Sequence, residues 1–189
     1  MHKNLQAMLS GVLALPMLLA AQQPPTAAPA NPITASEKGL YMVIVSPVVR
    51  AAEKMPEENY AFKPTPEVRS FGQLVGHVAD ANYAFCAQAQ GLPNPAKNIE
   101  KTKTSKADLV AALKDSVASC GKAFDAMTDA SGSELVKFHG FQLAKLTLLS
   151  LNTAHTDEHY GNMVTYLRLK GIVPPSSENA PAPAKTSGN

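Results

Sequence analysis

The chain carries little net charge, since 17 basic and 15 acidic residues among 189 leave a formal balance of +2. A balance this small does not indicate a nucleic acid or an anionic membrane as the partner. No basic stripe interleaved with aromatic residues is present, and no glycine-rich phosphate-binding loop. The sequence therefore gives no support to nucleic-acid binding, and we expect a small-molecule substrate or ligand.

No charged residue occurs between Lys3 and Glu37. The apolar stretch 5–21 follows a basic start and ends in small residues, which is typical of a secretory signal peptide. It is short and interrupted by Pro16, which argues against a retained membrane-spanning helix. We therefore expect residues 1–21 to be a signal peptide. The mature protein is then periplasmic or secreted, with no stable membrane insertion after cleavage.

The proline content divides the rest of the chain. Residues 22–32 contain four prolines and several alanines, which suits an extended linker. Residues 176–189 have a similar composition and are expected to form a disordered tail. The folded part is therefore about residues 33–175, the size of one domain.

Only two cysteines are present, Cys86 and Cys120. Neither lies near the predicted cleavage region, which argues against a lipid-modified N-terminus. Export to an oxidising compartment makes them candidates for a disulfide. Two buried thiols are the alternative.

The sequence has no convincing strand alternation and no internal repeat, and it predicts four helices instead. Capping-box spacing marks two helix starts, at Thr34 with Glu37 and at Ser70 with Gln73. Four helices in one domain indicate an all-α four-helix bundle. The predicted helices cover about residues 36–54, 70–90, 105–127 and 142–170.

The connection between the second and third helices, residues 92–104, is longer than an antiparallel neighbour requires. Its 13 residues can extend to roughly 45 Å, whereas the second helix is roughly 30 Å long. It can therefore cross the bundle and make the two helices parallel. Cys86, 16 residues after Ser70, then lies at nearly the height of Cys120, 15 residues after Ser105. We predict a Cys86–Cys120 disulfide, which needs Cα atoms roughly 4.4 to 6.8 Å apart.

Three histidines are the main candidates for chemistry. His155 and His159 are four residues apart, so on a helix they project from one face. His77 lies in another predicted helix, also at an inward-facing position. Three neutral imidazoles form a facial set of metal ligands that leaves a coordination position open, as catalytic sites do and structural sites do not. We therefore predict a divalent metal site at these residues.

Burial of three imidazoles needs compensation, because an unpaired buried polar group costs roughly 1–3 kcal/mol. A shared ion satisfies one nitrogen of each ring, and metal-bound histidines usually donate the other N–H to an acceptor. Asp80, one turn after His77, is expected to accept such an N–H, and Asn162, three residues after His159, is expected to be a hydrogen-bonding group beside the ligands. Histidines that serve only the structure of the bundle are the alternative.

These residues and their surroundings resemble the DinB-like superfamily of four-helix bundles. The resemblance extends from about residue 33 to residue 175, including the segment Glu57–Pro66 before the second helix and Gly171–Pro175 after the fourth. It rests mainly on two motifs, Gly72-Gln73-Leu74-Val75-Gly76-His77 and His155-Thr156-Asp157-Glu158-His159-Tyr160-Gly161-Asn162.

The resemblance implies an up-down-down-up bundle with a long crossover between helices 2 and 3, in agreement with the parallel pair above. It also implies a zinc or nickel ion held by His77, His155 and His159, and a possible homodimer. Relatives include bacillithiol transferases and mycothiol-dependent isomerases, and many members have no established activity. The export signal and the cysteine pair depart from the cytosolic thiol transferases. Asn162 stands where many members have glutamine.

Two functions of different classes follow. The first is a metal-dependent enzyme, a hydrolase or thiol transferase of unknown substrate, with Glu158 as its proton-transfer group. The second is a non-catalytic periplasmic metal- or ligand-binding bundle, since no clear acid, base or nucleophile accompanies the metal ligands. A pocket that reaches the open coordination position favours the enzyme, and a metal sealed inside the bundle favours a structural role.

Overall fold

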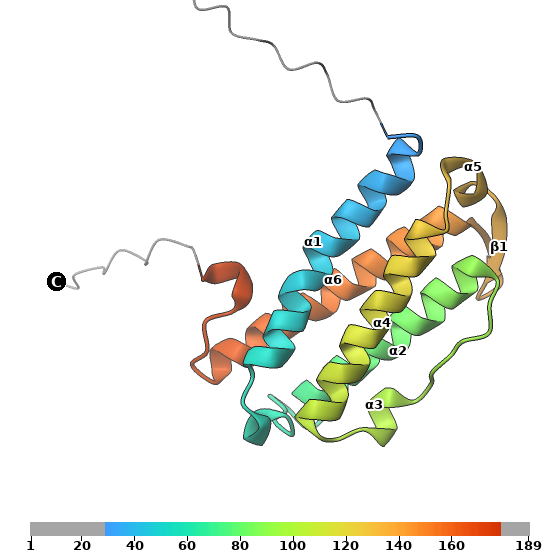
Figure 1. Cartoon of the computed structure of the whole chain (residues 1–189). Coiled ribbons are helices and arrows are strands. Elements are labelled where there is room, and N and C mark those ends of the chain that lie inside the picture. Colours follow the sequence, from blue (N-terminus) through green and yellow to red (C-terminus); the bar gives the residue numbers. More distant parts are fainter. Residues whose placement is uncertain (1–28, 179–189) are drawn as a thin grey trace, which may run out of the picture.

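Four long helices form the body of the protein in a computed structural model that describes residues 29 to 178 (Figure 1). They are α1 (Pro32–Lys54), α2 (Phe71–Gln90), α4 (Lys106–Asp125) and α6 (Lys145–Leu169). The short elements are η1 (Glu57–Asn59), α3 (Ile99–Thr102), α5 (Asp129–Gly132), the hairpin β1 (Leu135–Phe138) and β2 (Phe141–Ala144), and η2 (Pro175–Ser177). Within residues 29 to 178, no helix has both the length and the apolarity needed to span a bilayer. The predicted signal peptide and most of the predicted linker lie outside the described residues.

The ends of α2 and α4 follow from the local sequence. The Ser70 hydroxyl accepts the N–H of Gln73 at 3.2 Å, and the Gln73 side chain accepts the N–H of Ser70 at 2.8 Å. The predicted capping box is therefore present. Gly91 ends α2 with a φ of 69°, a left-handed conformation that glycine adopts readily. Ser105 caps α4 by accepting the N–H of Asp108 at 3.1 Å.

Helices α2 and α4 run parallel, because the contacts between them advance along both helices in the same direction. Asn82 donates to Ser116 Oγ at 3.1 Å, and four residues further along each helix Cys86 forms a disulfide with Cys120. The two Cα atoms are 5.2 Å apart, inside the range that a disulfide requires. The predicted disulfide and the predicted parallel pair are both confirmed. The crossover that permits this arrangement contains α3 (Figure 1).

Helices α1 and α6 form the second parallel pair. Near their starts Ser150 Oγ donates to Glu37 at 2.7 Å, and near their ends Lys54 donates to the carbonyl of Val173 at 2.8 Å. Helix α6 is antiparallel to α2, since the hydroxyl of Tyr166, near the end of α6, bonds the backbone just before α2 begins. The bundle is therefore up-down-down-up, as expected.

Helix α1 begins earlier than the sequence pattern predicts, and the predicted capping box of Thr34 with Glu37 is wrong. The helix starts at Pro32, whose fixed φ suits the first helical position. The Asp129 carboxylate from α5 accepts the N–H groups of Ile33 and Thr34. These hydrogen bonds, that of Thr34 first, lower the pKa of Asp129. A tertiary contact thus replaces the local cap.

The expectation that the chain has no strands is also wrong, because residues 135–144 form an antiparallel hairpin. Its two turn residues, His139 and Gly140, have φ values of 45° and 85°. A positive φ at both positions is what the commonest two-residue hairpin turn requires. Helix α6 consequently begins at Lys145 rather than near Gln142.

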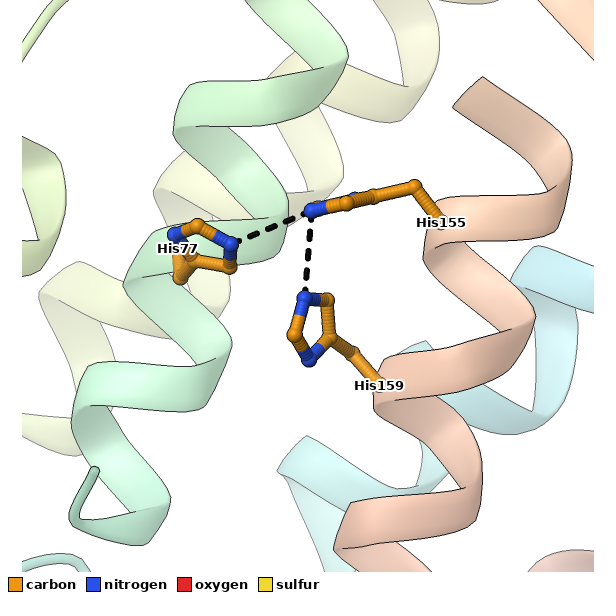
Figure 2. A group of neighbouring side chains, drawn as sticks. All are labelled: His77, His155 and His159. Atoms are coloured by element: carbon orange, nitrogen blue, oxygen red, sulfur yellow. Dashed lines mark hydrogen bonds between the residues drawn. The ribbon is translucent and has the colours of Figure 1, made fainter. Parts of the chain in front are cut away.

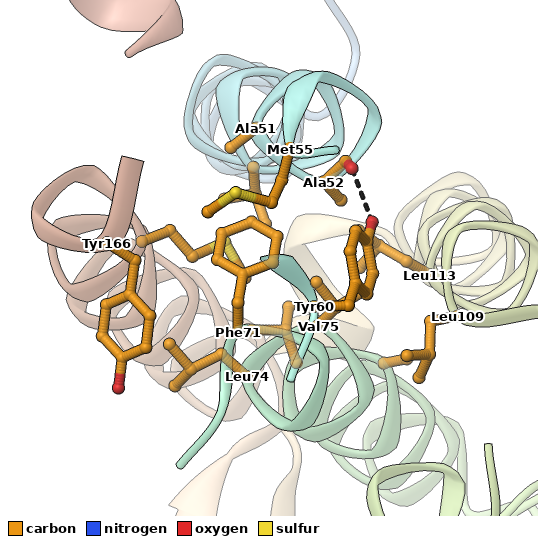
Figure 3. Packing of buried hydrophobic residues seen from close by; sticks show 14 of the residues in the cluster. Ala51, Ala52, Met55, Tyr60, Phe71, Leu74, Val75, Leu109, Leu113 and Tyr166 are labelled. Atoms are coloured by element: carbon orange, nitrogen blue, oxygen red, sulfur yellow. Dashed lines mark hydrogen bonds between the residues drawn. The ribbon is translucent and has the colours of Figure 1, made fainter. Parts of the chain in front are cut away.

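Two buried clusters fill the bundle. The larger lies beside the start of α2, where Phe71 meets Tyr60 edge-on at 5.3 Å between ring centroids (Figure 3). The Tyr60 hydroxyl donates to the Ala52 carbonyl at 2.5 Å, which ties the segment after α1 to that helix. The smaller cluster surrounds the disulfide and includes Tyr41 and Phe124.

The buried side of α6 includes polar side chains. Asn152 and Thr156 are fully buried, whereas the apolar Leu151 is 41% exposed and Asn162 is exposed. Buried positions recur every three or four residues along one side of the helix, at Leu148, Asn152, Thr156, His159 and Met163.

The described chain continues for three residues past the predicted end of the domain at residue 175, and these residues contact the bundle. The N–H of Ser176 donates to the Tyr160 hydroxyl at 2.9 Å. Glu178 forms ion pairs with Arg50 and Lys54 of α1. The rest of the predicted tail lies outside the described residues.

Candidate metal centre

Three imidazoles converge between α2 and α6 (Figure 2). His77 stands on α2, and His155 and His159 stand one turn apart on α6. The Nε2 atom of His155 lies 3.1 Å from Nε2 of His77 and 3.1 Å from Nε2 of His159. One nitrogen from each ring lies within 4.8 Å of the other two. The structure therefore brings the three candidate ligands together as a group that could hold a metal ion.

This donor set fits a divalent ion better than it fits hydrogen bonding among the rings alone. A tetrahedral ion with bonds of about 2.05 Å spaces its nitrogen ligands about 3.3 Å apart, and two of the observed separations are 3.1 Å. Without an ion, either one proton or one lone pair at His155 Nε2 must serve both neighbouring nitrogens, because a ring nitrogen offers only one of the two. A cation satisfies all three lone pairs at once.

Burial favours the neutral form of two of these rings. Desolvation, followed by the nearby charges of His159, His77 and Arg69, lowers the pKa of His155 to about 4. The pKa of His159 is also lowered, first by desolvation and then by His77. Neutral imidazole is the form that ligates metal, so these lone pairs are available at neutral pH.

The carboxylate that reaches His77 is that of Glu100, not that of Asp80 as expected. Glu100 Oε2 lies 3.0 Å from His77 Nδ1, and Glu100 Oε1 lies 2.9 Å from Arg69 Nε. The Asp80 carboxylate instead accepts the backbone N–H groups of Ile99 and Glu100, each at 3.0 Å. Free N–H groups at a helix start attract carboxylates, which explains the difference. Asp80 therefore acts on α3 and not on the imidazole.

His159 has the expected polar neighbour in Asn162, whose amide nitrogen lies 3.3 Å from Nδ1. Ligation through Nε2 leaves Nδ1 protonated, and the amide would then turn its oxygen toward the ring. His155 Nδ1 is buried and has no hydrogen-bond partner within the described part of the chain. The three rings thus differ, with a carboxylate on one, an amide on the second and neither on the third.

A pocket of about 750 Å³ opens beside the histidines. Its lining includes His159 and Asn162 from α6 together with Arg69 and Glu100. Glu158, the expected proton-transfer group, is exposed on α6 and lines the same pocket. The pocket therefore meets the candidate metal site at His159.

Aromatic side chains lie at the other end of the site. The His155 ring is 5.9 Å from the Phe85 ring of α2, which is 5.0 Å from the Phe138 ring of β1. The hairpin that the sequence pattern did not predict thus supplies an apolar wall beyond His155. The site opens toward the start of α2 and is covered toward the end of α2.

Glu100 is the residue beside the candidate site that sequence reasoning missed. It follows His77 by 23 residues, in a stretch predicted to be a simple crossover. The available signal was Gly76, directly before His77, since a glycine inside a helix can mark the close approach of another backbone. That signal indicates a contact but does not name the partner.

The comparisons with known proteins agree with this architecture. The sequence model of the DinB superfamily matches residues 48–163, which include all three histidines. No curated protein matches the sequence. The chain is similar in structure to a DinB-like protein from Bacillus cereus, with a TM-score of 0.68 and 14% identity over 75% of this chain and 95% of that one. It is also similar to a DinB-like protein from Bacillus subtilis, with a TM-score of 0.62 and 20% identity over 73% and 94% of the two chains. Likeness at these identities shows the fold alone.

Proposed function

The chain belongs to the DinB superfamily, and we propose that it is an exported, metal-dependent enzyme that acts on a small molecule. His77, His155 and His159 hold the ion, which is zinc or nickel. The reaction is a hydrolysis or a thiol transfer. One observation carries the proposal, namely that the three converging nitrogens lie beside an open pocket to which His159 belongs.

The donor set determines what kind of group the site attracts. Three neutral imidazoles leave the double positive charge of a divalent ion intact, which favours an anionic donor at the open position. A bound ion supplies Lewis acidity, by which it polarises a substrate or lowers the pKa of water. Phe85 and Phe138 place apolar rings at the end of the site beyond His155.

Glu158 is the proposed proton-transfer group. It immediately precedes His159 on α6 and lines the pocket that the substrate would occupy. Its exposed carboxylate can exchange protons with solvent between turnovers. Glu100 also lines the pocket, but both of its oxygens are engaged, one by His77 and one by Arg69.

The metal content of the mature protein tests the first half of the proposal. The protein is purified without a histidine tag or chelator, beside the His155→Ala/His159→Ala double variant. We expect about one zinc or nickel ion per chain in the wild type and none in the variant. A wild type that takes up neither ion, even after each is added, contradicts the proposal.

Catalytic turnover tests the second half of the proposal, that the protein is an enzyme. Hydrolase and thiol-transfer substrates are screened with the metal-loaded protein, and Glu158→Gln is then assayed on any substrate found. We expect the variant to keep its metal and to lose roughly 10²–10⁴-fold in turnover, the usual contribution of a positioned acid or base. Unchanged turnover removes Glu158 from the reaction.

A non-catalytic metal- or ligand-binding protein is the second candidate. The observation that favours it is that both oxygens of Glu100 are engaged by Arg69 and His77, so that the other carboxylates of the pocket, Glu67 and Glu158, are exposed side chains with no buried acid or base among them. A metal-loaded protein that binds small anions in the pocket but turns over none of the screened substrates supports this candidate.

We also propose that the protein is periplasmic or secreted. The support is the intramolecular disulfide, since disulfides persist in oxidising compartments, together with the predicted signal peptide at residues 1–21. The intact mass of the protein from each cell fraction tests this. Full-length, reduced protein in the cytoplasm contradicts the proposal.

A further inference from the structure

We propose that Glu100 is a positioning residue for the metal centre and that α3 presents it to His77. This inference rests on the proposed metal site and goes beyond it, because it assigns part of the control of ion affinity to the crossover between α2 and α4. Glu100 is not a ligand itself, since its carboxylate faces the nitrogen of His77 that points away from the other two imidazoles.

The contact fixes where His77 carries its proton. An ionised carboxylate only accepts hydrogen bonds, so Nδ1 of His77 must be the donor across the 3.0 Å to Glu100 Oε2. The Nε2 atom then keeps its lone pair, and this is the atom that faces His155 Nε2 at 3.1 Å. Carboxylates that accept from a ligand histidine in this way hold the ring in its tautomer and orientation.

The backbone around Glu100 is built to hold it close to α2. Asp80, three residues after His77 on α2, accepts the N–H groups of Ile99 and Glu100 at 3.0 Å each. A Cβ atom at Gly76 would lie 2.6 Å from the Cα of Glu100 and 2.8 Å from its N, so only glycine permits this approach. The close backbone approach at Gly76 and the hydrogen bonds of Asp80 therefore fix the position of α3 against α2. The two residues lie before and after His77 in the sequence.

Arg69 fixes the other oxygen of Glu100. Its Nε donates to Oε1 at 2.9 Å, while the carbonyl of Arg69 accepts the Tyr166 hydroxyl at 2.6 Å. Tyr166 lies on α6, the helix that carries His155 and His159. Arg69 thus connects the Glu100 carboxylate with α6, since its side chain bonds Glu100 and its backbone carbonyl accepts from Tyr166.

The other two imidazoles lack an equivalent support. The neighbour of His159 is the neutral and exposed amide of Asn162, and His155 Nδ1 has no partner within residues 29 to 178. Hydrogen bonds to charged acceptors are about twice as strong as neutral ones. Loss of Glu100 should therefore weaken ion binding more than loss of Asn162.

Zinc affinity, measured by competition with a chromogenic chelator on the full chain, tests the inference. We expect Glu100→Ala to bind zinc roughly 10–100-fold more weakly than the wild type. Glu67→Gln removes another carboxylate of the same pocket and should bind zinc normally. Gly76→Ala should weaken binding although Glu100 is unchanged, and Glu100→Gln, which keeps an acceptor oxygen, should recover part of the loss. Glu100→Ala with wild-type affinity overturns the inference and leaves the metal site intact.

A second measurement uses the wild-type protein and therefore does not depend on whether a variant folds. In the metal-free wild type, long-range ¹H–¹⁵N correlation spectra report which nitrogen of His77 is protonated. We expect the proton on Nδ1, and a proton on Nε2 overturns the inference. A wild type with the Nδ1 proton that binds no zinc overturns the proposed metal site, and this inference with it.

Discussion

Opening the disulfide between Cys86 and Cys120 should lower the free energy of unfolding by several kcal/mol. The bond joins residues 34 apart in sequence. The chain-entropy relation for a closed loop of that length gives about 3.8 kcal/mol at 25 °C. At roughly 2–4 °C per kcal/mol for a chain of this size, the melting temperature should fall by about 8–15 °C.

The surroundings of the disulfide indicate that most of this value will be observed. Both cysteines are fully buried, and the Asn152 amide lies 3.8 Å from Sγ of Cys86 and 3.7 Å from Sγ of Cys120. The helices that it joins are also held by the hydrogen bond from Asn82 to Ser116. The folded state therefore keeps its structure when the bond opens, and the main change is the greater freedom of the unfolded chain.

Urea unfolding with and without reductant, in the presence of a chelator to remove the contribution of metal, measures the effect. The Cys86→Ala/Cys120→Ala variant is the control, since its stability must not respond to reductant. It should be somewhat less stable than the reduced wild type, because the shorter side chains leave a cavity. If the reduced and oxidised wild type differ by less than about 1 kcal/mol, the loop-closure reasoning is refuted.

Three further predictions concern pH, the crossover and a helix cap. In the metal-free protein, stability should fall as the pH drops from about 6.5 to about 4, because the unfolded chain protonates His155 before the folded chain does. Acid titration by circular dichroism should show a smaller loss over this interval for His155→Gln than for the wild type. Gly76→Ala should lose roughly 1–3 kcal/mol of stability through the clash with Glu100. The control Gly39→Ala, at an exposed helical position with open space around it, should gain roughly 0.4–1 kcal/mol. Urea unfolding of both variants measures the difference. Ser70→Ala removes the α2 cap and should lose roughly 0.5–2 kcal/mol in the same assay; a loss below that range assigns the start of α2 to tertiary packing.

The parts of the fold that local chemistry controls could be predicted from the sequence. Ser70 with Gln73 and the glycine at position 91 set the ends of α2, and Ser105 begins α4. The disulfide followed from equal heights on two parallel helices. The three histidines could be grouped because helical spacing orients His155 and His159, and the apolar face of α2 orients His77.

The remaining features depend on residues distant in sequence. The start of α1 is capped by Asp129 from α5, a contact that no local pattern records. Glu100 reaches His77 only because α3 folds back onto α2. Most of the hairpin, residues 135–144, falls between the predicted third and fourth helices, and its turn depends on the positive φ of His139 and Gly140. In each of these places a tertiary contact or a turn conformation decided the structure.

The coordination of the ion in the metal-loaded protein tests the central claim most directly. X-ray absorption at the zinc edge should show about three imidazole nitrogens at about 2.0–2.1 Å, with the remaining position filled by a light atom. The count of imidazoles should fall in His77→Ala as well as in His155→Ala. Sulfur ligands at about 2.3 Å, or a spectrum that is unchanged in both variants, would contradict a site made of His77, His155 and His159.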